Sequence, residues 1–372
     1  MTAQVGRKKQ RRILEWGINL AGVLAFGLIL YWGGAEAWEQ ILHGDWRYVL
    51  AAFAVTLLWN LLAAYRWSLV AGQVIGEEGA ICPFRYYFTY HMIGMFIGQV
   101  VPITVGMLGG RPVALSLSRG VSLRRSALSV LLDKFFDLAL ALLLVVPVVL
   151  YLVDWISRPL AFGLMAGMVV LGALLAGWQY ERGMALIGQA GARLSRPLVH
   201  LPLIGRRLVQ RLPEQLARLS EASGIDNQLA VRSFALTLVM YALLATRLFF
   251  IAQALRLDIP WYLLAMGLCV TQLAVVFSIT PGSLGFLEGG WAAVMGLAGL
   301  TSDQFLTFVI GRRAYFLIFI LASTLLAFGW IRESPARLFR DVLSASRQAP
   351  QAKPAPDPAS AGEAENTPAM EA

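Results

Sequence analysis

Two apolar segments of the chain are each interrupted by proline and glycine, and the interruptions lie at matching positions. Pro102 and Pro281 are 179 residues apart, and the same offset relates Gly106 to Gly285. Proline lacks a backbone donor and glycine adopts unusual backbone angles, so both stretches interrupt a helix. Apolar segments broken at corresponding positions are typical of transporters built from two repeats. We predict hairpin breaks at Pro102, Gly106, Pro281, Gly282 and Gly285.

The composition indicates that these segments lie in a membrane. Hydrophobic residues make up 58% of the chain and charged residues 14%, whereas a soluble domain is nearer half apolar and a quarter charged. We expect an all-α polytopic membrane protein with about six full transmembrane helices and two re-entrant helical hairpins, arranged as an inverted repeat. The expected spans are 14–33, 47–70, 125–153, 158–178, 229–256 and 303–331, and the expected hairpins are 84–118 and 261–299.

The distribution of charge predicts the orientation. The net charge is +9, but the basic residues gather in loops between apolar spans, which is the positive-inside pattern and does not indicate a nucleic-acid partner. We expect a multi-pass protein of a bacterial-type inner membrane, with both termini cytoplasmic and the acidic loop 34–46 outside. The two hairpins would then enter from opposite faces and meet near the midplane, where inverted-repeat transporters bind substrate.

The regions outside the expected spans differ in composition, and this suggests how the chain is divided. A basic stretch between residues 181 and 226 is expected to form an amphipathic insertion on the cytoplasmic leaflet, and a solvated linker is the alternative. The tail is rich in Ala, Pro, Glu and Ser, which predicts disorder. The parts are a cytoplasmic N-terminus (1–13), a transmembrane domain (14–331) with repeats at about 14–153 and 158–331 and the insertion at 181–226, and a cytoplasmic tail (332–372).

Five charged residues lie deep inside the third and the last of the expected spans. Asp133, Lys134 and Asp137 lie in the third span, and Arg312 and Arg313 lie at equivalent depth in the last. Ionisable groups at this depth cost several kcal/mol unless they are paired or hydrated, so they mark functional sites by default. One interpretation is a polar cavity that binds a phosphate headgroup. The alternative is an ion-pair network between these two spans that fixes their packing.

Other polar residues are weaker candidates. Glu288 is expected to hydrogen-bond the broken backbone or the start of the following helix, or to act as a protonatable coupling site. Arg247 lies deep in its span, and with Glu288 and Arg111 it is expected to line the headgroup cavity. For Arg111 the alternative is an anchor. Arg66 is expected to snorkel to the cytoplasmic surface. His91 is expected to be a packed, hydrogen-bonded residue rather than a ligand.

The sequence shows no residue pattern that is typical of catalysis or metal binding. The chain has two cysteines, Cys82 and Cys269, in different apolar regions, and its three histidines are scattered. No metal-ligand spacing, disulfide framework or nucleophile–base cluster is apparent. We therefore expect neither a cofactor nor a metal, and we do not expect an enzyme.

At these motifs the chain resembles a known family, the flippase-like integral membrane domain of lysylphosphatidylglycerol synthases. The segment Thr280-Pro-Gly-Ser-Leu-Gly-Phe-Leu-Glu288 resembles its Pro-Gly-Gly-Leu-Gly-x-x-Glu signature. The segment Ser129-Val-Leu-Leu-Asp-Lys-Phe-Phe-Asp137 is similar to its acid-base-x-x-Asp element, and Arg312 or Arg313 matches an arginine in its last span. The resemblance covers about residues 14–331.

One motif departs from the family. The family often has Pro-x-x-x-Gly-Glu-x-x-Arg in the first hairpin, but here Met107 replaces the acid and Gly110 the arginine, with Arg111 one position further on. The family's bifunctional members add an aminoacyl-transferase domain, for which we expect no room after the last span. The resemblance thus implies translocation of an anionic or aminoacylated phospholipid or a polyprenyl-phosphate-linked lipid. The alternative is a non-transporting partner of a lipid- or glycan-modifying enzyme.

Overall fold

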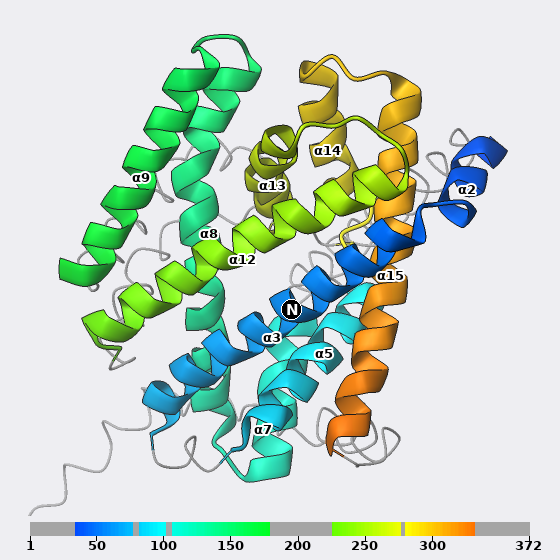
Figure 1. Ribbon diagram of the computed structural model, residues 1–372. Coiled ribbons are helices and arrows are strands. Elements are labelled where there is room, and N and C mark those ends of the chain that lie inside the picture. The colour runs from blue at the N-terminus through cyan, green and yellow to red at the C-terminus, as the bar shows by residue number, and fades with distance from the viewer. Residues whose placement is uncertain (1–33, 77–81, 102–105, 179–224, 277–279, 332–372) are drawn as a thin grey trace, which may run out of the picture.

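The computed structural model describes residues 34–76, 82–101, 106–178, 225–276 and 280–331, and these residues form helices and short connections (Figure 1). Five of the described helices are long and apolar enough to cross a membrane. They are α3 (Trp46–Ile75), α8 (Leu123–Leu152), α9 (Arg158–Trp178), α12 (Asn227–Ala254) and α15 (Ser302–Ile331). The shorter elements are α2 (Gly34–Leu42), α5 (Phe84–Val100), the π-helix η1 (Gly106–Gly110), α7 (Arg111–Arg119), α13 (Trp261–Val276) and α14 (Phe286–Leu297). The protein is therefore an all-helical membrane protein.

These helices confirm five of the six predicted spans, each within a few residues of its expected ends. The predicted span 14–33 lies outside the described residues, as do the N-terminal stretch 1–13, the tail 332–372 and nearly all of the insertion 181–226. The segment 34–46 is not the loop that the sequence predicts, because most of it forms helix α2.

The ends of three long helices are fixed by local side chains. Asp45 precedes α3 and accepts a hydrogen bond from the Arg47 amide at 2.9 Å. Ser122 precedes α8 and accepts a hydrogen bond from the Arg125 amide at 3.3 Å. Asp226 precedes α12 and accepts one from the Leu229 amide at 2.6 Å. A side-chain oxygen at this position satisfies one of the amides that a helix start leaves without an intrahelical partner.

The 179-residue offset read from the sequence recurs in the helix boundaries. Adding 179 to both ends of α8 gives residues 302 and 331, which are the two ends of α15. Gly120 and Gly299 are also 179 residues apart, and their φ angles are +69° and +75°. Each follows the short helix that leads into one of these long helices, in a conformation that favours glycine. The two halves thus share the length of their last long helix and a glycine of positive φ shortly before it.

Corresponding helices of the two halves run in opposite directions (Figure 1). The chain ascends through α8 and descends through α15, and α3 packs against α12 with the opposite chain direction. The pair α5 and α7 lies at the lower end of the molecule, whereas α13 and α14 lie at the upper end. The two short-helix hairpins therefore approach the centre from opposite ends.

The tips of the two hairpins touch. The amide of Gly282 donates to the carbonyl oxygens of Gly98 at 3.1 Å and Val101 at 3.2 Å. Gly282 has a φ of +57° and lies in the break between α13 and α14. The predicted breaks at Pro281, Gly282 and Gly285 all fall in this gap, and Gly106 opens η1 in the first hairpin, whereas Pro102 lies outside the described residues. The expectation that the hairpins meet is confirmed by these backbone contacts.

Small residues allow the close packing of each hairpin. A Cβ on Gly106 would lie 2.5 Å from the amide nitrogen of Gly98 and 2.9 Å from the carbonyl oxygen of Gly94. In the second hairpin the buried ring of Trp291 fills the space beside Gly267 and meets the ring of Phe308 at 5.2 Å between centroids. Close backbone approach at glycine is a common way for helices to associate in membranes.

Candidate functional site

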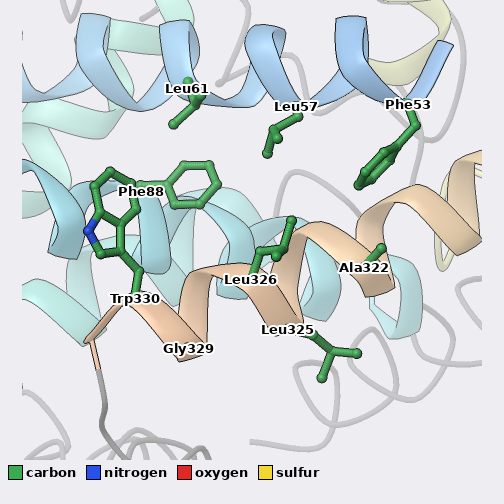
Figure 2. Close-up of a pocket in the computed structure, with 9 residues that line it drawn as sticks. All are labelled: Phe53, Leu57, Leu61, Phe88, Ala322, Leu325, Leu326, Gly329 and Trp330. Atoms are coloured by element: carbon green, nitrogen blue, oxygen red, sulfur yellow. The ribbon is translucent and has the colours of Figure 1, made fainter. Parts of the chain in front are cut away.

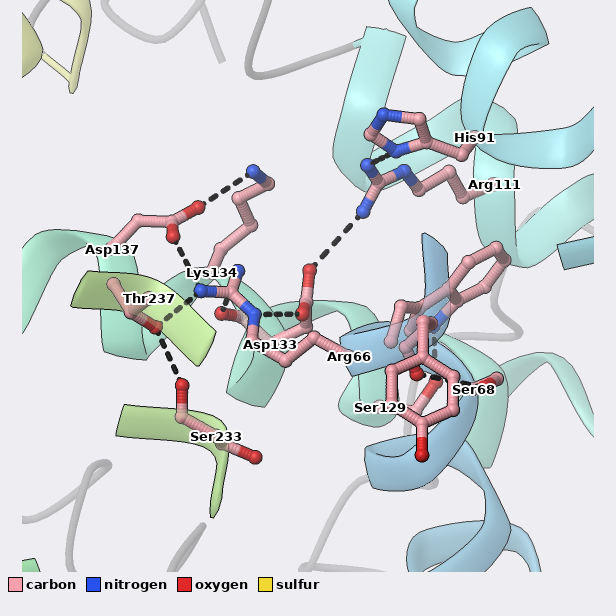
Figure 3. A network of polar contacts seen from close by, with 12 residues as sticks. Arg66, Ser68, His91, Arg111, Ser129, Asp133, Lys134, Asp137, Ser233 and Thr237 are labelled. Atoms are coloured by element: carbon pink, nitrogen blue, oxygen red, sulfur yellow. Dashed lines mark hydrogen bonds and ion pairs between the residues drawn. The ribbon is translucent and has the colours of Figure 1, made fainter. Parts of the chain in front are cut away.

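The charged side chains that are buried or half-buried within the described helices form two groups. The first, here called the Arg66 cluster, contains Arg66, Arg111, Asp133, Lys134 and Asp137, drawn in Figure 3. The second, the Arg312 cluster, contains Arg247, Glu288, Arg312 and Arg313. All eight residues expected at a headgroup site fall in one cluster or the other, and Arg66 joins them.

Arg66 of α3 is the centre of the first cluster. Its Nε donates to Asp133 Oδ1 at 2.8 Å and its Nη1 donates to Asp137 Oδ1 at 2.6 Å. Nη1 also donates to Thr237 Oγ1 of α12 at 2.5 Å, and Nη2 donates to the carbonyl oxygen of Asp133 at 3.0 Å. Asp133 and Asp137 are one helical turn apart on α8, so both carboxylates face the same guanidinium.

The prediction that Arg66 snorkels to the surface is therefore wrong, because its side chain is fully buried. The predicted span ended at residue 70, but α3 continues to Ile75, which places Arg66 deeper along the helix. At that depth the carboxylates of α8 offer better partners than distant water. A guanidinium has five donors in a fixed fork, which suits the simultaneous engagement of several acceptors.

Arg111 adds a second buried guanidinium to this cluster. Its Nη1 donates to Asp133 Oδ2 at 3.2 Å, and its Nη2 donates to His91 Nδ1. Because arginine can only donate, Nδ1 of His91 is the acceptor, and Nε2 carries the proton that reaches Asn60 Oδ1 at 3.0 Å. The prediction that His91 is a packed, hydrogen-bonded residue is confirmed. Arg111 is fully buried and does not anchor at a surface.

Lys134 completes the Arg66 cluster at its more open side. Its Nζ lies 2.8 Å from Asp137 Oδ2, and the lysine side chain is 28% exposed. The three cations and two carboxylates leave this cluster with one excess positive charge when His91 is neutral. Within the Arg66 cluster as described, Arg111 Nε is the one buried guanidinium atom without a hydrogen-bond partner.

Glu288 of α14 is the only carboxylate that pairs within the Arg312 cluster as described. Its Oε2 accepts from the Gly285 amide at 2.8 Å, which caps the helix that follows the break. Its Oε1 lies 3.6 Å from Arg312 Nη2 and 3.8 Å from Arg313 Nη1. The expectation that Glu288 hydrogen-bonds the broken backbone is confirmed.

Arg313 ties α15 to the same break. Its Nη1 donates to the carbonyl oxygen of Gly282 at 2.8 Å, beside the contact between the hairpin tips. Arg313 and Glu288 therefore both hold the irregular backbone between α13 and α14. Such support is required because interrupted backbone in an apolar setting leaves polar groups that must find partners.

Arg247 of α12 reaches α15 close to Arg312. Its Cζ is 5.1 Å from the ring centroid of Phe316, which is one turn after Arg312 on α15. Its guanidinium therefore lies beside the stretch of α15 that carries Arg312. The Arg312 cluster thus holds three cations and one carboxylate, a larger excess of positive charge than the Arg66 cluster has.

The ion pairs correct the predicted network between the third and last spans. Asp133 and Asp137 of α8 pair with Arg66 and Arg111, on α3 and α7. The arginines of α15 pair instead with α14. Within the part of the chain that the structure describes, no ion pair joins α8 to α15. Partner choice depends on helix rotation and crossing, which the depth of a charge along its span does not reveal.

An apolar groove of about 840 Å³ lies apart from these charges, between α3, α5 and α15 (Figure 2). The residues that line it carry no charge; they are Phe53, Leu57, Leu61, Phe88, Ala322, Leu325, Leu326, Gly329 and Trp330. It therefore has no means of holding a charged headgroup. Among the described residues no group of three or more His, Cys, Asp or Glu side chains is placed to bind a metal.

Comparison with known proteins identifies the family. Residues 18–323 match the family model described as the lysylphosphatidylglycerol synthase TM region. The chain belongs to this family. The match lies in the transmembrane region of these synthases, in agreement with the resemblance seen in the motifs around Asp133 and Pro281. The protein is therefore a multi-pass integral membrane protein of the lysylphosphatidylglycerol synthase transmembrane-region family.

Two relatives of this family member come from Methanothermobacter thermautotrophicus (strain Delta H), and both are named UPF0104 membrane protein. One is 22% identical over 308 residues, which covers 77% of this chain and 84% of the relative. The other is 23% identical over 299 residues, which covers 75% and 84%. No solved structure matches the chain.

The structure also explains the departure of this family member from the first-hairpin motif. Met107, which stands where the family often has an acid, is buried among apolar side chains. Gly110 stands where the family has an arginine, and a Cβ at this position would lie 3.4 Å from Ile97 Cδ1 and 3.6 Å from Gly94 Cα. Arg111 turns instead toward Asp133, so the charge is retained in the hairpin but is directed into the Arg66 cluster.

Proposed function

We propose that the protein translocates a lipid with an anionic headgroup across the cytoplasmic membrane. The candidates are an anionic or aminoacylated phospholipid and a polyprenyl-phosphate-linked lipid. The observation that carries the proposal is the pair of buried, net-positive clusters inside apolar helices, one of them against the point where the two hairpins touch. Charges in such a setting are costly and are rarely retained without a function.

The proposed membrane arrangement has six spans and two re-entrant hairpins in an inverted repeat, with both termini cytoplasmic. The opposite directions of α8 and α15, and the approach of the hairpins from opposite ends, support it. The matched ends of α8 and α15 support a repeat of the same origin. In this arrangement the hairpin tips meet near the midplane, where a headgroup crossing the membrane faces its highest barrier.

The charge balance supports an anionic headgroup. The Arg66 cluster carries one excess positive charge and the Arg312 cluster carries two, counting the side chains described above. An anion that enters between the hairpins would gain from both. The headgroup would pass between the hairpins within the positive field of both clusters while the acyl chains stay in the bilayer, and the contact between Gly282 and α5 would open to let it through.

The test is translocation in liposomes reconstituted with the purified protein. Labelled phosphatidylglycerol and labelled polyprenyl phosphate are added to separate preparations, and the fraction of headgroup protected from an external reagent is followed over time. We expect translocation by the wild type and its loss in Arg312→Ala. Arg85→Gln is the matched control, because Arg85 is exposed and lies outside both clusters. It should behave as the wild type does.

Failure of every tested lipid to cross would contradict the transport proposal. That result would favour a non-transporting role, in which the protein is an accessory subunit of a lipid- or glycan-modifying enzyme in the same membrane. Translocation that persists at the wild-type rate in Arg312→Ala would leave the transport activity standing but would remove the Arg312 cluster from its path.

A further inference from the structure

The two charge clusters differ in how completely their donors are used. Arg66 has a partner for Nε, Nη1 and Nη2, and each partner lies within 3.0 Å. By contrast, Nε and Nη1 of Arg247 and Nε and Nη2 of Arg312 are buried and have no hydrogen-bond partner among the described residues. Leaving a buried charged donor without a partner is far more costly than leaving a neutral one. Four such donors on two neighbouring side chains indicate a missing acceptor.

The unused donors of Arg312 have a geometry that suits one kind of acceptor. Nε and Nη2 lie on the same edge of the guanidinium plane. That edge engages the two oxygens of a phosphate or a carboxylate through parallel hydrogen bonds. Glu288 does not use it in this way, because its Oε1 is 3.6 Å from Nη2 and its Oε2 is already bound to the Gly285 amide.

Arg247 is positioned to reach the same acceptor. Its guanidinium lies over Phe316, one turn from Arg312 on α15, so both cations face the same stretch of that helix. Two like charges held together without a counterion repel each other, and an anion between them removes the repulsion. The side chains keep a small opening, since Arg247 is 7% and Arg312 4% exposed, whereas Arg66 and Arg111 are completely sealed.

We propose that Arg247 and Arg312 form the phosphate-binding subsite of the protein, and that the Arg66 cluster is a structural lock rather than a second binding site. This proposal rests on the transport function proposed above and assigns the headgroup phosphate to one of its two clusters. The chemistry that the subsite recognises is a phosphate monoester or diester. A lipid headgroup and free inorganic phosphate both present it.

The test is a binding titration of the full-length protein purified in a zwitterionic detergent. The probes are inorganic phosphate, dihexanoyl phosphatidic acid, and dihexanoyl glycerol, which has the same chains without phosphate. The variants are Arg247→Gln and Arg312→Gln, with Arg85→Gln as control. We expect phosphatidic acid to bind and each cluster variant to weaken binding at least tenfold, the loss that corresponds to one charge-assisted bidentate contact.

The probes also distinguish the two sources of phosphate. If phosphatidic acid binds much more tightly than inorganic phosphate, the subsite takes a lipid headgroup. If the two bind equally, it takes the free anion. In both cases the glyceride should not bind at this site. Binding of phosphatidic acid that changes less than twofold in both variants, or no binding to the wild type at all, overturns the subsite.

Thermal unfolding of the unliganded variants separates a binding role from a structural one. Removing one of two repelling cations should leave the unliganded protein as stable as the wild type or more stable, while the stabilisation by phosphatidic acid is lost. Arg247→Lys keeps the positive charge but removes the planar guanidinium donors. If a glutamine variant does not fold, this variant replaces it, and it should also bind at least tenfold more weakly. A drop in unliganded stability, with ligand stabilisation intact, overturns the proposal.

The failure of this proposal can be distinguished from failure of the transport function. Binding of phosphatidic acid in the titration, together with no crossing of labelled phosphatidylglycerol or polyprenyl phosphate in liposomes that contain the wild type, contradicts transport and leaves the subsite standing. Translocation that continues unchanged in Arg247→Gln, together with unchanged binding, overturns the subsite and leaves transport standing.

Discussion

Arg66 and Asp133 are joined twice, through Nε to the carboxylate at 2.8 Å and through Nη2 to the backbone carbonyl oxygen at 3.0 Å. The second bond links the side chain of α3 to the main chain of α8, so it fixes the position of one helix against the other and not only the pairing of two charges. With Asp137 and Thr237 the same guanidinium also reaches further along α8 and across to α12. One side chain thus connects three long helices.

Replacing Arg66 should therefore destabilise the fold strongly. We expect Arg66→Met to cost about 3–5 kcal/mol, because it removes one partner of the buried Asp133 carboxylate and of the half-buried Asp137 carboxylate. The measurement is thermal or denaturant unfolding in detergent. Lys134→Gln is the matched control, since Lys134 is partly exposed and should cost less than about 1 kcal/mol. Equal stability of Arg66→Met and the wild type would contradict a structural lock.

Gly106 should not tolerate a side chain. A Cβ at this position would lie 2.5 Å from the Gly98 amide nitrogen, so Gly106→Ala must push η1 away from α5. We expect a loss of about 1–3 kcal/mol in unfolding free energy, as for other overpacked sites. Gly109→Ala is the control in the same π-helix, because a Cβ there meets no atom within 4 Å. The prediction fails if the two variants are equally stable.

Gly282 is constrained both by its backbone and by its neighbours. Its φ is +57°, and an added Cβ would lie 2.6 Å from Arg313 Nη2. Gly282→Ala should cost about 1–2 kcal/mol from the left-handed backbone alone, and it should also disturb the Arg313 contact that holds the break. The expected result is lower thermal stability and slower lipid translocation. Gly289→Ala, where a Cβ meets nothing within 4 Å, should leave both unchanged.

The cap of α12 should give a pH-dependent contribution to stability. The Leu229 amide, and after it the Gln73 side chain, hold the pKa of Asp226 below its ordinary value. A carboxylate whose folded pKa is lowered stabilises the folded state above the unfolded pKa of about 4, and this contribution is lost as the pH falls through the lower folded value. Asp226→Asn should therefore lower the melting temperature at pH 7, and the difference from the wild type should narrow toward pH 3. A difference independent of pH would contradict the electrostatic part of the cap.

The proposed orientation can be tested by labelling single cysteines. The background is a variant without Cys82 and Cys269, both of which are buried. Trp155 lies between α8 and α9 and is 78% exposed, so Trp155→Cys should react with an impermeant maleimide added to intact cells. Arg124 lies at the other end of α8, and Arg124→Cys should react only after the cells are opened. The reverse pattern would invert the topology.

The sequence predicted the helices well for a simple physical reason. Stretches that cross hydrocarbon contain few charged residues, so the ends of α8, α9 and α15 lie within a few residues of the charged or polar residues that flank each apolar stretch. The breaks at Pro281 and Gly285 were also visible, because proline and glycine act on their own backbone regardless of the fold. The contact between the hairpin tips followed from the opposite directions that the topology gave to the two halves.

The pairing of charges could not be predicted in the same way. Depth along a span is a property of one helix, whereas the pairing of Asp133 with Arg66 depends on how α3 and α8 cross. The error for Arg66 arose from ending its span at residue 70, while the helix continues to Ile75. The shared string Leu-Leu-Ala before Arg66 and Arg247 gave no sign that the first arginine is saturated with acceptors and the second is not.

The helices α3, α8 and α15 each contain 30 residues. At 1.5 Å per residue such a helix is about 45 Å long, whereas the hydrocarbon of a typical bilayer is about 30 Å thick. The extra length can be taken up by tilt or can extend into the headgroup region, at a cost of only fractions of a kcal/mol for each Å of mismatch. The scaffold can therefore adapt to bilayers of different thickness by changing its tilt, while the buried pair of Arg66 and Asp133 stays enclosed between its helices.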